Sequence, residues 1–206
     1  MSTMIWIGVN GKTVDVTVNG AGKIDASTTG YNQGTTAIGV EHGSTLNLNN
    51  VDVMAGFGAI LVGGNVGDGG GHAGHTGAAK VNVKGGSLGT SAGYAVGTNG
   101  ADTFTHVLHF TDVEIQGHLN ATGIGYAMYL PAPADVTIDG ASKVTDTSGI
   151  AVKAGKLTLG GTTVVTATGD KNTKLVDGGE DLSTNGNNDT GAAVAVFDQK
   201  SGGYQS

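Results

Sequence analysis

The stretch TLNLNNVDV (residues 45–53) decides the fold of this chain. Apolar Leu46 and Leu48 alternate with polar Asn47 and Asn49, and this period of two places alternate side chains on opposite faces of a strand. Five other segments repeat the first half of the stretch: DVTVNG (15–20), KVNVKG (80–85), VLHFTD (107–112), DVTIDG (135–140) and KLTLGG (156–161). The stretch is therefore one copy of an internal repeat.

Alignment of the six segments gives two apolar files with a polar file between them. The first apolar file contains Val16, Leu46, Val81, Leu108, Val136 and Leu157, although Val14 could replace Val16. The second contains Val18, Leu48, Val83, Phe110, Ile138 and Leu159, and the polar file contains Thr17, Asn47, Asn82, His109, Thr137 and Thr158. A third apolar site follows each turn, at Ile24, Val51 or Val53, Leu88, Val113 or Ile115, Val144, and Val164 or Val165. We predict that the apolar files face inward and the polar file faces outward.

A second motif, small residue–x–Ala–aliphatic, precedes most of these segments. Its alanines are Ala37, Ala59, Ala95, Ala127, Ala151 and Ala193, and IWIGV (5–9) is a diverged copy. The shortest spacings are 22 residues (37 to 59) and 24 residues (127 to 151). Three short strands per turn of this length predict an all-β fold, a right-handed single-stranded parallel β-helix of about six coils of 22–24 residues plus inserted loops. A β-sandwich also has many short strands, but it does not require near-identical strands at constant offsets from a repeated motif.

We expect residues 1–206 to form a single β-helix segment, with inserted loops at about 63–78, 98–105 and 169–190. The last repeat, which begins at GAAVAVF (191–197), stops before its second strand. An open solenoid end exposes unpaired backbone and apolar core. We therefore expect either an excerpt of a longer protein or an end that contacts another chain.

The composition agrees with a thin aliphatic core. The chain contains 39 glycines, where average usage would give about 14. It has two prolines and no Gly-X-Y period, so it is neither collagen nor proline-rich disorder. Its net charge is −7, and it contains no arginine, which argues against a nucleic-acid partner. Without cysteine it has no disulfides, and no stretch reaches the roughly 20 apolar residues of a membrane helix.

Two phrases carry a resemblance to a known family: TAIGVEHGSTLNLNNVDV (36–53) and GYAMYLPAPADVTIDGASKV (125–144). They resemble the pectate-lyase-like β-helix superfamily, and above all the passenger domains of Gram-negative autotransporter adhesins. The resemblance covers roughly residues 5–198 and specifies a fold better than a function. It implies a secreted or cell-surface protein with roles in cell adhesion, self-association or virulence. The N-terminus, MSTMIWIGVNGKT, lacks the features of a signal peptide. The chain is therefore either cytosolic or given without its signal peptide.

Polysaccharide lyases and glycoside hydrolases of this fold use an Arg or Lys base beside Ca²⁺-binding carboxylates, or clustered aspartates. Asp15 and Asp135 align, but several coils separate them. Asp112 and Glu114 are two residues apart and are expected on one strand face, with no obvious partner on neighbouring coils. The sequence therefore favours a protein that is not an enzyme, and no catalytic residue is assigned.

The candidate metal ligands are the histidines and the carboxylates of the acidic loop. His72 and His75, with Asp68, could hold a metal, but their glycine-rich loop favours an exposed segment instead. His106, His109 and His118 are expected to be surface polar residues. The last inserted loop concentrates carboxylates that could bind Ca²⁺ but match no known calcium motif: Asp170, Asp177, Glu180, Asp181 and Asp189. No metal or cofactor is assigned. The sequons at Asn120 and Asn188 would matter only in a eukaryotic secretory route.

The sequence therefore predicts a non-catalytic adhesin or structural stalk. The expected partner is a host or bacterial surface glycan or protein, or a second copy through the solenoid. Recognition is expected on the inserted loops, because coils supply rigidity and loops supply variety. The alternative is a polysaccharide-degrading β-helix enzyme or a phage tail-spike-like glycan-binding protein.

Overall fold

The computed structural model describes residues 2–27, 35–63, 76–99, 102–119, 125–169, 176–177, 180–181 and 191–196. The first and third predicted loops fall largely outside these ranges, which omit residues 64–75 and most of 170–190, whereas the second loses only residues 100–101. The described chain is almost entirely strand, with one 3₁₀ turn, η1 (Val9–Gly11). Two short strands of the last inserted loop, β17 (Val176–Asp177) and β18 (Glu180–Asp181), form a separate antiparallel pair.

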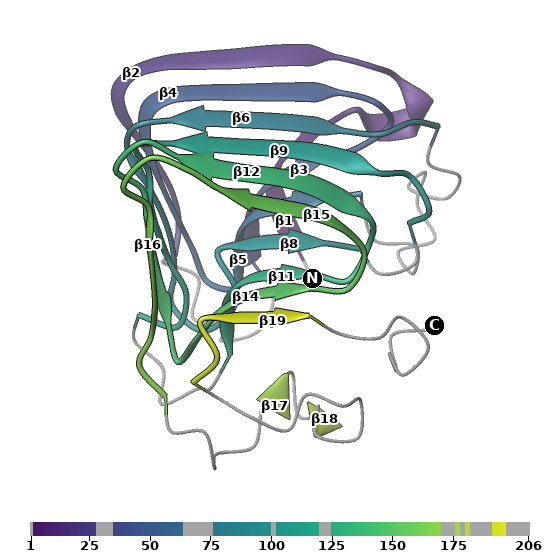
Figure 1. The fold of residues 1–206 in the computed structure, drawn as a ribbon. Helices are drawn as coiled ribbons and strands as arrows, with labels where there is room; N and C mark the ends of the chain where they lie inside the picture. The colour runs from purple at the N-terminus through teal and green to yellow at the C-terminus, as the bar shows by residue number, and fades with distance from the viewer. Residues whose placement is uncertain are drawn as a thin grey trace.

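The other strands form two parallel sheets, seen in Figure 1. The seven-stranded sheet, here called wall A, contains in spatial order β1 (Ser2–Ile7), β3 (Thr35–Val40), β5 (Gly58–Val62), β8 (Val96–Thr98), β11 (Tyr126–Leu130), β14 (Ser148–Val152) and β19 (Val194–Val196). The ten-stranded sheet is curled, because β2 (Asp15–Ala26) and β4 (Thr45–Ala55) run along both of its halves. These parallel sheets, one of them curled, are consistent with a β-solenoid.

The curled sheet forms two more walls. Wall B contains the first halves of β2 and β4 with β6 (Lys80–Lys84), β9 (His106–Thr111), β12 (Ala134–Asp139) and β15 (Gly155–Leu159). Wall C contains their second halves with β7 (Ser87–Thr90), β10 (Glu114–Gln116), β13 (Lys143–Asp146) and β16 (Val164–Ala167). The chain passes through walls A, B and C in turn, and each strand pairs in parallel with its counterpart in the next coil.

The register confirms the predicted files. On wall B the pairs Val16↔Leu46, Leu46↔Val81 and Val81↔Leu108 continue to Val136 and Leu157, which selects Val16 over Val14 in the first coil. On wall C the file that faces the interior contains Ile24, Val53, Leu88, Ile115, Val144 and Val165. The two apolar files of wall B are almost completely buried in the middle coils. They become more exposed at both ends, where Val18 is half-buried and Leu159 is 45% exposed.

The corner between walls B and C explains the repeated Asn, Asp and Gly after each wall B strand. In every coil one residue there has a positive φ: Gly20, Asn50, Gly85, Asp112, Gly140 and Gly161. Glycine adopts this conformation without steric cost, and Asn and Asp tolerate it best among the others. Gly86 also has a positive φ, and a Cβ there would lie 2.2 Å from the Val51 carbonyl oxygen. This corner therefore fixes the length of each wall B strand.

The alanine motif is correct in five copies and wrong in one. Register places Ile38, Ile60, Val96, Met128, Ile150 and Val194 in one file, so the residue before each belongs to the alanine file. In the sixth coil this residue is Gly149, whereas Ala151 pairs with Tyr129, two residues further along. A Cβ at Gly149 would lie 2.2 Å from the Ala193 carbonyl oxygen and 2.5 Å from Val165 Cγ1. This close approach excludes the alanine that the motif predicts.

Aromatic side chains pack mainly along wall A. Phe110 is the exception, because it is fully buried in the interior core of the described residues. The Tyr94 ring lies over Gly97, and its centroid is 4.9 Å from that of Phe57 and 6.0 Å from that of Tyr129. Lys153 Nζ lies 5.3 Å from the centroid of the Tyr129 ring. Burial lowers the pKa of Lys153. The interior can thus be thin because the large rings lie elsewhere.

Candidate functional site: a trough on wall C

The outer surface of wall C is hollowed along β7. Register places Ser87 beside Glu114, and Gly89 between Met54 and Gln116. Because Leu88 is fully buried, the alternation of the strand turns Ser87 and Gly89 outward. A serine and a glycine between longer side chains on β4 and β10 leave a trough parallel to the strands.

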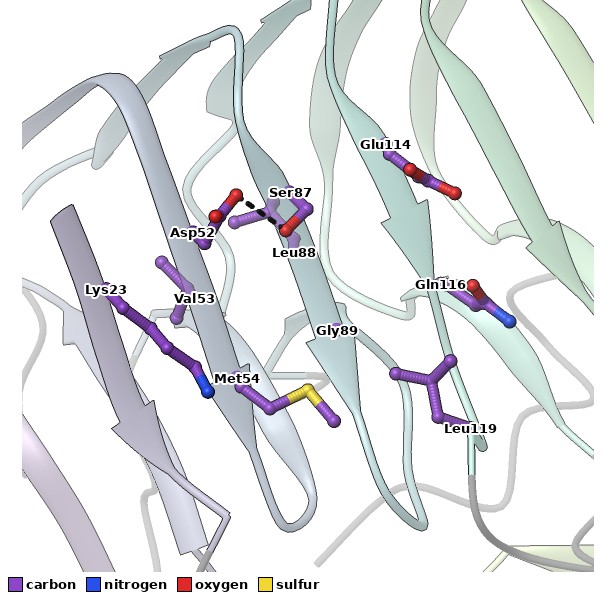
Figure 2. A pocket seen from close by; sticks show the side chains of 10 residues that line it. All are labelled: Lys23, Asp52, Val53, Met54, Ser87, Leu88, Gly89, Glu114, Gln116 and Leu119. Carbon is purple, nitrogen blue, oxygen red and sulfur yellow. Dashed lines mark hydrogen bonds between the residues drawn. The ribbon is translucent and has the colours of Figure 1, made fainter. Parts of the chain in front are cut away.

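Figure 2 shows the trough, with Asp52 and Met54 on one side of β7 and Glu114 and Gln116 on the other. Its volume is about 360 Å³. At one end the Ser87 hydroxyl donates a 2.8 Å hydrogen bond to Asp52 Oδ1, and the exposed Glu114 carboxylate stands on the opposite side. This end presents hydrogen-bond acceptors. The lining consists of Lys23, Asp52, Val53, Met54, Ser87, Leu88, Gly89, Glu114, Gln116 and Leu119.

The other end of the trough is apolar. A Cβ placed on Gly89 would lie 2.9 Å from Met54 Sδ and 3.1 Å from Leu119 Cδ1, so these two side chains approach each other over the glycine. Leu119 is 40% exposed although it is a large aliphatic residue. Gln116 flanks this end (Figure 2). The lining of the trough thus changes from carboxylates at one end to aliphatic side chains at the other, over the length of two outward-facing residues.

Lys23, at the margin of the trough, carries a compensated charge. Its Nζ lies 2.7 Å from Asp25 Oδ2. The pKa of Asp25 is lowered, first by the hydrogen bond from Lys23 and then by hydrogen bonds from the hydroxyl and the backbone N–H of Ser27. Asp52 and Glu114 are the carboxylates that line the trough, and register places Lys143 beside Glu114 on the side away from β7.

Wall B presents a second polar surface. Asn82 Nδ2 donates to Asn47 Oδ1 at 2.8 Å, and Asn47 Nδ2 donates to Thr17 Oγ1 at 3.2 Å. In the next outward file Asn49 Nδ2 donates to Asn19 Oδ1 at 2.7 Å. These amides form a ladder in which each donates toward the preceding coil. A shallow groove of about 360 Å³ follows it, lined by Thr17, Asn47, Asn49, Asn82, Val83, Lys84, His109 and Thr111.

His109, Thr111 and Asp139 meet at the edge of this groove. His109 Nε2 lies 2.9 Å from Asp139 Oδ2, and the Thr111 hydroxyl donates to Asp139 Oδ1 at 2.6 Å. These contacts, from Thr111 first and His109 second, lower the pKa of Asp139. A nucleophilic hydroxyl must give its proton to a base. The Thr111 hydroxyl also lies 3.3 Å from His109 Nε2, so one ring nitrogen faces both the hydroxyl and the carboxylate, whereas in a Ser-His-Asp triad the two ring nitrogens face different partners.

Three further histidine–carboxylate pairs lie in the described chain, one of them the buried pair His42 and Glu41, with His42 Nε2 3.6 Å from Glu41 Oε2. His106 Nε2 is 3.1 Å from Asp102 Oδ2, both side chains are buried, and the Ala79 N–H donates to His106 Nδ1 at 3.1 Å. Since Nδ1 accepts, the ring proton of neutral His106 is on Nε2, which faces the carboxylate. In the third pair His118 Nδ1 lies 2.8 Å from Asp146 Oδ2, and the Thr147 N–H donates to Asp146 Oδ1.

These positions correct three expectations. His106 is completely buried and His118 has a side chain 12% exposed, so neither is a surface residue as predicted. His109, with a side chain 45% exposed, is one. Asp112 does not share a strand face with Glu114, because it is a corner residue with φ 56° that accepts a hydrogen bond from the Ala141 N–H, and β10 begins only at Glu114.

Asp15 and Asp135 lie in one outward file of wall B, four strand steps apart, so the expected separation is confirmed. Several other candidates lie outside the described residues: Asp68, His72, His75, Asn120, Asp170, Asn188 and Asp189. Asp177, Glu180 and Asp181 fall in β17 and β18, where only the backbone is described. In the ranges with described side chains, no three His, Cys, Asp or Glu residues gather as a metal site.

The apolar files alone do not predict the trough. Its signal lies in the residues between them, because VDVMA (51–55), SLGT (87–90) and EIQ (114–116) align with serine and glycine in the middle segment. Leu119 lies beyond the end of β10 and has no counterpart in such an alignment.

No protein-family model, no curated protein and no solved structure matches the chain. In the part of the chain with assigned structure, no helix is long and apolar enough to span a membrane.

Proposed function

We propose that this chain is a right-handed parallel β-helix of the pectate-lyase-like kind and a non-catalytic segment of a secreted bacterial surface protein. It acts as an adhesin or stalk that binds a surface glycan or protein, or a second copy of itself. The trough along β7 is the observation that carries this proposal. It is a concave site with both polar and apolar lining, built on paired strands of a rigid wall.

Two observations support binding over catalysis. The carboxylates that approach histidines hold the fold together: Asp102 and Asp146 are buried, and Asp139 links neighbouring coils through Thr111. The strands that carry the trough are parallel and in register, so their side chains are held at fixed intervals of about 4.8 Å. A fixed row of acceptors suits repeated, reversible contact with a ligand.

One observation favours the alternative of a glycoside hydrolase. Asp52 and Glu114 flank the trough from strands two steps apart, about 9.6 Å between strand axes. Inverting glycosidases hold their two carboxyl groups about 6.5–9.5 Å apart. Asp52, however, accepts a hydrogen bond from Ser87 within the trough wall.

The test combines binding with turnover. The chain is incubated with polyuronates, neutral glycans and bacterial capsular glycans, and both retention on immobilised glycan and release of shorter products are measured. We expect retention without products. Asp135→Ala on wall B is the control for Asp52→Ala and Glu114→Ala, because its carboxylate lies on another wall. Depolymerisation that Glu114→Ala abolishes and Asp135→Ala preserves would establish the hydrolase.

A further inference from the structure

We propose that the trough binds a neutral 6-deoxyhexose unit of a glycan. The sugar hydroxyls donate to Asp52 and Glu114, and the methyl group packs against the surface that Met54 and Leu119 form over Gly89. This inference rests on the proposed function, because it names the ligand class for the same trough.

The polar end of the trough selects a ligand that donates hydrogen bonds and carries no negative charge. Ionised carboxylates only accept hydrogen bonds, so Asp52 and Glu114 need donors opposite them. Sugar hydroxyls supply such donors in adjacent pairs. A uronic acid or a sulfated sugar would place a negative charge near both carboxylates, and Lys23 does not offset this because Asp25 already holds its ammonium group.

The apolar end selects a methyl group over a hydroxymethyl group. Met54 Sδ and Leu119 Cδ1 converge over Gly89, which contributes no side chain of its own. A hydroxyl placed against them would lose water without gaining a hydrogen bond from either side chain, which costs free energy. A methyl group at the same place buries apolar surface on both sides. Among common hexoses, the 6-deoxy sugars have a methyl group at one edge and hydroxyls at the other.

The dimensions agree with one sugar ring. Outward residues of a strand are about 6.6 Å apart, which is the distance from Ser87 to Gly89 along the floor. The volume of about 360 Å³ lies near the lower end of small-molecule sites, about 300–1,000 Å³. The trough is open along the strand direction, so the sugar can be a terminal or an internal unit of a longer chain.

The test measures dissociation constants of the full chain by NMR titration with methyl α-L-fucoside and methyl α-L-rhamnoside. The matched ligands are methyl α-L-galactoside and methyl α-L-mannoside, which differ from them only by a hydroxyl at carbon 6. Methyl galacturonoside tests the effect of negative charge. We expect the 6-deoxy sugars to bind roughly tenfold more tightly than their parents, and the uronoside to bind no better than the parents.

Two variants place the binding in the trough. Gly89→Ala adds a methyl group where Met54 and Leu119 meet, and Asp52→Asn removes one charged acceptor; each is expected to weaken binding about fivefold or more. Gly22→Ala, with nothing within 4 Å of its added Cβ, and Asp135→Asn on wall B are the matched controls. Equal affinity for the 6-deoxy and parent sugars, or the absence of any measurable binding, would overturn the ligand class. Unchanged affinity in Gly89→Ala and Asp52→Asn would overturn the site. If Gly89→Ala abolishes retention on some other glycan, the ligand class fails while the proposed function stands.

Discussion

His106 is a residue whose partners are all fixed by the fold. Its Nδ1 accepts from the Ala79 N–H, its Nε2 faces Asp102, and the ring is completely buried. His106→Ala leaves a buried N–H and a buried carboxylate without the ring, and we expect unfolding free energy to fall by about 3–5 kcal/mol. Urea denaturation measures this loss. The control is His109→Ala at the exposed pair with Asp139, where the expected loss is under about 1 kcal/mol. Equal losses would contradict the assigned roles.

Asp139 links stability to pH. Its pKa in the folded protein is lowered from the ordinary 3.8 by hydrogen bonds from Thr111 and His109. A carboxyl whose folded pKa is below its unfolded pKa stabilises the fold above the unfolded value, and this contribution disappears as pH falls through the folded value. We therefore expect Asp139→Asn to reduce stability at pH 6 and to have little effect below the folded pKa. Denaturation measured from pH 6 downward checks this, because the difference between Asp139→Asn and the unchanged protein should shrink as pH falls, with Asp135→Asn, in the same strand, as the control.

The sequence was least informative about the roles of individual polar residues. Asp112 is the last residue of the segment VLHFTD and His106 directly precedes this segment, yet one is a corner residue with positive φ and the other is buried. A single polar residue near a strand end can cap, face inward or face outward, and which of these it does depends on the neighbouring coil. The role of Asp112 becomes clear from the hydrogen bond that it accepts from the Ala141 N–H, 29 residues away in the sequence.

Among the elements, the corner between walls B and C sets the strictest requirement. Gly86 has φ 79°, and an added Cβ would lie 2.2 Å from the Val51 carbonyl oxygen. We expect Gly86→Ala to destabilise the protein by at least about 2 kcal/mol, from strain and from this backbone contact. Gly22→Ala adds the same methyl group in open space, and the expected change is within about 0.5 kcal/mol. Thermal unfolding of the two variants would falsify this reading if they behaved alike.

The sequence predicted the strands, and which of their residues face inward, more completely than any other feature. Both apolar files of wall B and the polar file between them are confirmed to the residue, because period-two alternation leaves no intermediate register. The third file was left with pairs of alternatives, since a corner residue such as Val51 or Val113 is also buried. The alanine motif failed at Ala151 because small residues pack alike, and the close approach of the Ala193 carbonyl and Val165 distinguishes Gly149.

At the scale of the whole molecule, the coils differ in how many neighbours they have. In the described chain β15 and β16 each pair with one strand, whereas β9 and β12 each pair with two. Solenoid stability is a sum over neighbouring repeats, so end coils open more readily. We expect amide hydrogen exchange to be slowest in β6, β9 and β12 and faster in β2 and β15. Mass spectrometry of peptides from each coil measures this order, and uniform protection would contradict it.

The parallel strands and their apolar files could be predicted from sequence, whereas the trough could not. Repetition reveals the coil because the same side chains recur at matching places, but a site requires places that differ. Ser87 and Gly89 are such a departure on β7, and they become visible only when the outward residues of three consecutive coils are placed side by side.

That dependence on three coils has an evolutionary consequence. Since every coil joins its neighbours through the same register, duplication of residues 35–119 would copy Asp52, Met54, Glu114 and Leu119 together, shifted by about 14 Å along the axis. A lineage could thereby multiply its contacts with a repetitive glycan and gain avidity without changing one side chain. Loss of one of these three coils, in contrast, would remove the site, while the remaining coils could still pair in the same register.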